Sequence, residues 1–358
     1  MSRMYGLDLF RLTAMLMITV LHFNNQHLGL LDSNRPLSHY VFGVTVEYAC
    51  FCGVNCFAIL SGFLLKKSDD FYGEKWFARI MNLWIKMIFW GIGIYLAASW
   101  FFPNTKFSWS ELIKFFFPIM EITWWYINAY LGLLVFLPLL NKGIGKCSSQ
   151  EQFWLSLSLF LMFSIFPVAS FSVGKGAFAL HGGYSTIWLM ICFIWGCILK
   201  DNIEIILQRR RLNLFLIGGV VAAIGIPVAF HLSGFRLHGI FMSYLSPFCI
   251  LEAVCLFILF YQIRINGCRI RKIIVSLSSN ALGIYLLQAH PLIWNNFIIV
   301  RPLETLTLPQ YAALLAILSL LLGSVGILLN VIIERIYSFC RMPSFVVWMY
   351  HAVAAVFH

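Results

Sequence analysis

An arginine and a histidine stand eleven residues apart in the first apolar stretch of the chain, residues 8–28. In an α-helix this separation is about three turns plus roughly 20°, so Arg11 and His22 lie on one face. A rise of ~1.5 Å per residue places them roughly 16 Å apart along the axis, about half the hydrocarbon thickness of a bilayer. Because an ionisable group at such depth is costly, His22 indicates either a hydrogen-bonded contact between helices or a functional site.

A second set of polar residues lies within the apolar stretch 79–102 and just before it. Its members recur at i, i+4, i+7 and i+11 on one helix face, and they are Lys75, Arg79, Asn82 and Lys86. Cations facing a bundle interior suit an anionic ligand that enters from the cytoplasm, and phosphate groups fit best. Snorkelling to the interface is the alternative for Lys75, whereas Lys86 lies too deep for it.

Three further ionisable residues interrupt later apolar stretches. Glu47 lies some six residues inside the expected outer surface, where we interpret it as solvated. Glu252 stands near the middle of its stretch and needs a partner, a proton or a cavity. His290 is followed by Pro291, which interrupts a helix and leaves the direction of the histidine open.

The composition sets the class of protein. Hydrophobic residues make up 61% of the 358, charged residues 11%, and the mean hydropathy is +0.86, which is typical of a chain surrounded by lipid. The net charge of +11 comes mostly from basic residues between apolar runs, so it indicates membrane orientation and no nucleic acid partner. The ten cysteines lack metal-ligand spacing, and we interpret them as small core residues, with no metal site.

Ten apolar stretches are long enough to be membrane spans. They are residues 8–28, 41–65, 79–102, 124–141, 153–172, 185–200, 212–232, 239–262, 274–299 and 311–334. Of the 25 Lys and Arg residues, the connections on the N-terminal side hold about three times as many as those on the other side. The sequence therefore predicts an all-α integral membrane protein, a single bundle of about ten transmembrane helices with both termini in the cytoplasm.

Two segments fall outside this count of spans. Residues 107–122 are too charged to cross and predict an amphipathic or re-entrant piece on the outer side. Residues 345–358 are apolar but too short to span, so they predict an interfacial tail. The predicted domain organisation is a transmembrane domain over 1–344 followed by this tail.

Three sequence elements, in this order, resemble those of family-3 membrane acyltransferases, which O-acetylate bacterial cell-surface sugars. They are Asp8-Leu9-Phe10-Arg11 with ten residues before His22, Gly53-Val54-Asn55-Cys56-Phe57 leading to Leu60-Ser61-Gly62-Phe63, and Trp125-Tyr126-Ile127 leading to Pro138-Leu139. The chain departs from the family pattern in three places: Asn82 stands for a proline, Thr123 for a histidine, and Gln288 for a histidine displaced to His290. Some members carry a secreted esterase-like domain beyond the last span, and from a sequence that runs to His358 we expect none here.

The resemblance implies an O-acyltransferase in the bacterial cytoplasmic membrane. Its donor would be acetyl-CoA, bound from the cytoplasm as a substrate with no resident cofactor. Its acceptor would be a hydroxyl of a surface polysaccharide or a lipid-linked precursor on the outer side of the membrane. On this resemblance a neutral His22 acts as general base, or alternatively carries the acyl group.

The other candidate residues are assigned to the donor site and to the path of the reactants. Arg11, Arg79 and Lys86 would hold donor phosphates, with Lys75 and Asn82 beside them, and Asp8 would pair with Arg11. The residues expected to line the path are Asn55, Ser61, Gly62, Phe63, Trp125, Tyr126, Tyr285 and His290.

A transporter of an anionic glycan precursor or small metabolite is the alternative function, because the same charges could bind a ligand without reacting with it. The two halves of the chain do not match in their Gly- and Pro-interrupted segments, which weakens an inverted-repeat transporter. The oligomeric state stays open, with a homo-oligomer as one alternative.

Overall fold

The computed structural model describes residues 3–65, 72–103, 105–119, 124–172, 177–234, 238–296 and 306–356. Across these ranges all regular secondary structure is helical and no strand occurs. Within hydrocarbon every backbone N–H and C=O needs a partner in the protein, and a helix provides these partners from its own backbone. The predicted all-α membrane fold is therefore confirmed.

The chain divides into two compact units. Unit 1 comprises Met1–Lys67, Leu140–Ser279 and Val300–Leu321, and unit 2 comprises Ser68–Leu139, Asn280–Ile299 and Leu322–His358. Two long helices contribute to both units, namely α6 (Trp125–Ile144) and α16 (Leu308–Phe339).

Unit 1 contains the first helix and most of the middle of the chain. Its other helices are α1 (Tyr5–His22), η1 (Phe23–His27), α2 (Leu37–Phe51), α3 (Gly53–Leu65), α7 (Ser149–Phe160), η2 (Leu161–Ile165), α8 (Phe166–Ala169), η3 (Ala177–Ala179), η4 (His181–Gly183), α9 (Thr186–Leu207), α10 (Leu212–Leu232), α11 (His238–Phe241), α12 (Pro247–Tyr261) and α13 (Cys268–Ser279). Helix α1 packs against α2, α3, α12 and α13. The predicted catalytic helix therefore lies in the core of this unit.

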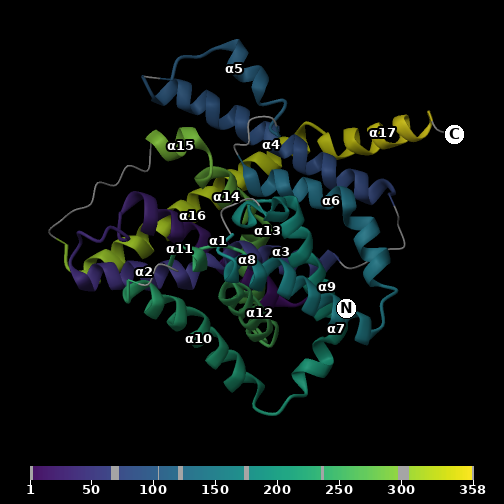
Figure 1. Cartoon of the computed structure of the whole chain (residues 1–358). Coiled ribbons are helices and arrows are strands. Elements are labelled where there is room, and N and C mark those ends of the chain that lie inside the picture. The colour runs from purple at the N-terminus through teal and green to yellow at the C-terminus, as the bar shows by residue number, and fades with distance from the viewer. Residues whose placement is uncertain are drawn as a thin grey trace. The chain divides into compact units, whose positions relative to one another are not determined.

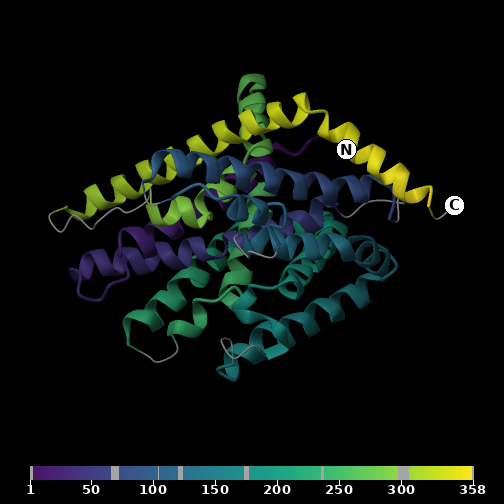
Figure 2. The same cartoon turned by 90° about the horizontal axis from the view of Figure 1, so that it is seen from above.

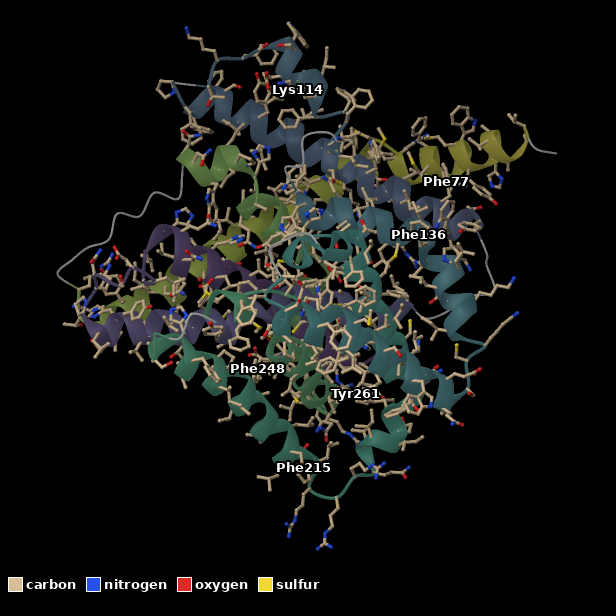
Figure 3. All side chains as sticks on the ribbon, viewed as in Figure 1. Phe77, Lys114, Phe136, Phe215, Phe248 and Tyr261 are labelled. Atoms are coloured by element: carbon tan, nitrogen blue, oxygen red, sulfur yellow. The ribbon has the colours of Figure 1, made fainter. Side chains whose placement is uncertain are left out.

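Helices α3 and α9 pack most closely in unit 1, at a pair of glycines. A Cβ atom on Gly62 would overlap the carbonyl oxygen of Phe193, and one on Gly196 would overlap that of Ile59. Small residues are the usual means by which membrane helices approach one another. By contrast, α10 turns an apolar face away from its partner α12, and its Phe215 is 70% exposed (Figure 3). Exposed apolar side chains on a membrane helix face lipid.

Unit 2 contains α4 (Glu74–Phe101), α5 (Trp109–Lys114), α14 (Leu282–Gln288), α15 (Pro291–Asn296) and α17 (Met342–Ala354). Helix α17 runs beside α4 (Figures 1 and 2). The rings of Phe77 and Tyr350 lie 5.7 Å apart there, and Nε2 of His351 is 3.3 Å from a carboxylate oxygen of Glu74. Residues 345–354 of the predicted tail are thus helical, as part of α17, and the place of the tail at the membrane interface stays a prediction.

Seven helices of the described ranges are long and apolar enough to cross a membrane. They are Tyr5–His27, Leu37–Leu65, Glu74–Phe101, Trp125–Ile144, Ser149–Ala169, Leu212–Leu232 and Leu308–Phe339. An eighth is counted if α13 and α14 form one broken span. The predicted spans 185–200 and 239–262 correspond to α9 and to the 15-residue α12. The count of ten therefore stays a prediction.

The expectation of one helix over 274–299 is wrong within the described part of that range. The chain there forms α13, α14 and α15, with breaks after Ser279 and after Gln288. The second break precedes Pro291, as expected, because proline has no N–H to donate and restricts the residue before it. The first break has no proline, and the apolar pattern gave no sign of it.

Candidate functional site

His22 is the last residue of α1, and the π-helical turn η1 continues directly from it. Such turns are rare and recur at functional sites. The Nδ1 atom of His22 is buried, and His27 ends the π-helical turn that follows it. The sequence analysis gave His27 no role. It lies five residues after His22, which is the spacing that a π-helical hydrogen bond joins.

A buried carboxyl group fixes this turn to the next helix. Glu47 of α2 is only 2% exposed, and its two oxygens accept hydrogen bonds from Nδ2 of Asn24 at 2.8 Å and Nδ2 of Asn25 at 3.3 Å. Nδ2 of Asn24 also donates to the carbonyl oxygen of Gly43 at 2.9 Å. The interpretation of Glu47 as solvated is therefore wrong, because the carboxyl group is buried and its partners come from the preceding turn η1.

Asp8 organises the other end of α1. It accepts two hydrogen bonds from Arg3, at 2.7 and 3.1 Å, and one from Oγ of Ser278 at 3.0 Å. The hydrogen bond with Asp8 raises the pKa of Arg3 above its ordinary value. Arg11 is also paired with Asp8, but at 4.0 Å. The expected contact between Asp8 and Arg11 is present, and the closer partner is Arg3, which the sequence analysis did not single out.

The second motif, Gly53–Phe63, contributes mainly to the packing of α3. Asn55 is fully buried, donates to the carbonyl oxygen of Tyr244 at 2.9 Å, and accepts from Nε1 of Trp188 at 2.9 Å. Oγ of Ser61 donates to the carbonyl oxygen of Phe57, and Phe63 is buried. The Trp188 hydrogen bond and the glycine contact described above join α3 to α9, whereas the Ser61 hydrogen bond lies within α3. That these residues line a path stays a prediction, with no observation in its favour.

The polar residues Lys75, Arg79, Asn82 and Lys86 of α4, here called the cationic ladder, divide into an exposed and a paired half. Lys75 and Arg79 are exposed and have no ion-pair partner among the described residues. Nζ of Lys86 lies 2.5 Å from a carboxylate oxygen of Glu334 and 5.4 Å from the ring centroid of Tyr337. Tyr337 also donates a hydrogen bond to Oδ1 of Asn82. Because Glu334 already neutralises Lys86, the stronger donor-binding candidate in this ladder is Arg79.

An aromatic cluster forms in unit 2 around the third motif. The backbone N–H of Tyr126 donates to the hydroxyl of Tyr285 at 3.1 Å, and the ring of Trp125 lies 5.7 Å from that of Tyr126. Nε1 of Trp124 donates to the carbonyl oxygen of Leu286, and its ring is 5.4 Å from that of His290. The break before Pro291 therefore directs His290 towards the start of α6. Tyr126, Tyr285 and His290, expected on the path, belong to one cluster.

The candidate residues are thus distributed over both units. Arg11 and His22 belong to unit 1, whereas Arg79 and Lys86 belong to unit 2. Their assignment to one donor site and one reaction centre stays a prediction. Within the described ranges, no group of three His, Cys, Asp or Glu side chains is placed to hold a metal ion.

Comparison with known families identifies the class of protein. The model of an acyltransferase domain, that of acyltransferase family 3, matches residues 4–333, from the start of α1 to near the end of α16. No curated protein and no solved structure matches the chain significantly. The chain belongs to acyltransferase family 3. It is a multi-pass membrane acyltransferase, as the resemblance in its sequence motifs implied.

Proposed function

We propose that the protein transfers an acetyl group from cytoplasmic acetyl-CoA to a hydroxyl of a cell-surface polysaccharide, or of its lipid-linked precursor, on the outer side of a bacterial cytoplasmic membrane. The observation that carries the proposal is the position of His22. It is the last residue of α1, lies inside the candidate span Tyr5–His27 directly before the π-helical turn η1, and adjoins residues that Glu47 holds in place. A neutral imidazole at this depth can accept a proton without placing a permanent charge in hydrocarbon.

The reaction needs one proton acceptor and one leaving group. The acceptor hydroxyl oxygen attacks the thioester carbonyl carbon while its proton passes to the imidazole of His22. The tetrahedral intermediate collapses, the carbon–sulfur bond breaks, and His22 returns the proton to the CoA thiolate. Arg11 lies on the same face of α1 as His22 and pairs with Asp8. It would hold a donor phosphate near the other end of the helix.

In the alternative route, the imidazole nitrogen of His22 attacks the thioester first and releases CoA. The acceptor hydroxyl then displaces the acyl-imidazole and regenerates the histidine. The two routes differ when acceptor is absent. Radiolabelled acetyl-CoA alone leaves up to one label on each protein molecule if His22 carries the acyl group, and none if His22 is only a base.

The experiment that tests the proposal places donor and acceptor on opposite sides of a membrane. Purified protein in sealed vesicles receives labelled acetyl-CoA on the side of the N-terminus and cell-envelope glycan on the other side. Transfer of label to glycan across the bilayer supports the proposal. Protein that binds acetyl-CoA but labels none of a panel of glycans and lipid-linked sugars would contradict the proposed acceptor.

A further inference from the structure

A basic cavity of about 690 Å³ opens in unit 1 at the end of α1 that lies furthest from His22. Its walls come from the segment before α1, the ends of α9 and α12, the connection after α12 and the start of α13. Tyr261, at the end of α12, is one of its lining residues (Figure 3). The volume is within the range of sites that bind small molecules, roughly 300 to 1,000 Å³.

Three arginines from three different segments line this cavity, and none of its described lining residues carries a carboxylate. Arg3 is held from behind by its two hydrogen bonds to Asp8. Nε of Arg271 donates to the carbonyl oxygen of Ile265 at 2.5 Å, and its guanidinium lies 4.9 Å from the ring centroid of Tyr5. Arg264 has no hydrogen-bond or ion-pair partner within the described part of the chain. Two of the guanidinium groups are thus oriented before any ligand arrives.

We propose that this cavity binds the phosphorylated nucleotide end of the acyl donor, an inference that rests on the proposed function. A guanidinium group can bind a phosphate group through two parallel N–H···O hydrogen bonds, and arginine also stacks on aromatic rings. The rings of Tyr5 and Tyr261 supply flat surfaces beside the arginines. A nucleotide with several phosphates satisfies three separated cations better than a single phosphate does.

The distance between the cavity and His22 along α1 indicates what kind of donor fits. His22 lies seventeen residues beyond Tyr5, which is roughly 26 Å along the helix axis, and Arg11 lies roughly 9 Å along the same path. A donor anchored in the cavity therefore needs a long, flexible arm between its phosphates and its thioester. Coenzyme A thioesters have a long arm that can extend from the cavity past Arg11 in the direction of His22, whereas acyl phosphates and acyl nucleotides have none.

The test measures donor affinity in the full-length protein reconstituted in nanodiscs. Arg264→Gln and Arg271→Gln each remove one guanidinium from the cavity, and Arg269→Gln is the matched control, because Arg269 lies on α13 outside the lining. We expect the KM for acetyl-CoA to rise about tenfold in each cavity variant, with kcat within about twofold of wild type. Arg269→Gln should leave both constants unchanged.

A second substrate identifies which part of the donor binds. Acetyl-dephospho-CoA lacks the 3′-phosphate, and wild type should use it with a KM about tenfold higher than that for acetyl-CoA. In the cavity variants this preference should shrink towards unity. Unchanged KM values and an unchanged preference in both variants would overturn the inference while leaving the transferase activity intact.

Anionic phospholipid is the other source of phosphate, and binding of CoA itself separates the two. If Arg264→Gln and Arg271→Gln weaken CoA binding equally in phosphatidylcholine and phosphatidylglycerol nanodiscs, the nucleotide assignment holds. Phosphatidylglycerol could instead raise the thermal unfolding midpoint of the wild type. If the two variants lose that increase and keep normal CoA binding, the cavity is a lipid headgroup site. Wild-type protein that binds CoA but transfers no acyl group would count against the proposed function and not against this site.

Discussion

Glu47 and Lys86 show how single polar side chains are kept within a membrane bundle. Each has partners from another part of the chain: Glu47 accepts from two asparagines of η1, and Lys86 pairs with Glu334 of α16. The sequence shows that a polar residue at such depth needs a partner, because an unpaired one is costly. It does not show which residue is the partner, because that depends on how distant helices pack.

We expect Glu47→Ala to destabilise the protein more than Glu47→Gln does. The alanine removes both acceptor oxygens and leaves the side-chain amides of Asn24 and Asn25 without them, whereas glutamine keeps one oxygen. An unsatisfied buried donor costs about 1 to 3 kcal/mol. Thermal unfolding in nanodiscs measures the difference, with Glu111→Gln on the exposed helix α5 as control. Equal midpoints for wild type and Glu47→Ala would contradict the structural role of this carboxyl group.

Lys86 and Glu334 should behave as a structural pair. In a double-mutant cycle of Lys86→Met and Glu334→Gln, we expect a coupling free energy of up to about 1 kcal/mol, because both side chains are partly exposed. The KM for the donor should change little in Lys86→Met and rise in Arg79→Gln. A Lys86→Met protein with normal stability and a KM raised about tenfold would instead restore Lys86 to the donor site.

The helices themselves followed from the apolar runs, and the contacts between them did not. Stretches of about 20 apolar residues predict spans because a helix that crosses a bilayer needs that length. The break after Ser279 and the π-helical turn after His22 are details that such a count of apolar residues does not include. No residue pattern in the sequence marked either position. The close contact of α3 and α9 falls at Gly62 of the Gly53–Phe63 motif.

A substitution of Gly62 tests whether the Gly53–Phe63 motif packs helices or lines a path for the reactants. Because a Cβ at this position would overlap the carbonyl oxygen of Phe193, Gly62→Ala should lower the unfolding midpoint, at a cost of about 1 to 3 kcal/mol. Gly218→Ala is the control, since a Cβ there meets no atom within 4 Å. A Gly62→Ala protein with full stability and no activity would favour the path.

For the chain as a whole, the number of spans decides where the termini lie. Seven spans place the two termini on opposite sides of the membrane, whereas eight or ten place them on the same side. The bias of Lys and Arg predicts that both termini are cytoplasmic, so we expect an even number. Reporter fusions at each end should both give cytoplasmic signals. A C-terminal reporter that is active only outside would support seven spans and contradict the predicted topology.

The measurement that tests the central claim most directly compares acetyl transfer by wild type, His22→Ala and His181→Ala in the same sealed vesicles. His181 is an exposed histidine of η4 with no assigned role. We expect His22→Ala to lose about 10²- to 10⁴-fold in transfer rate while still binding CoA, and His181→Ala to keep the wild-type rate. Transfer at the wild-type rate by folded His22→Ala would contradict the account. Alanine can act neither as a base nor as an acyl carrier, so the reaction would then not depend on this position.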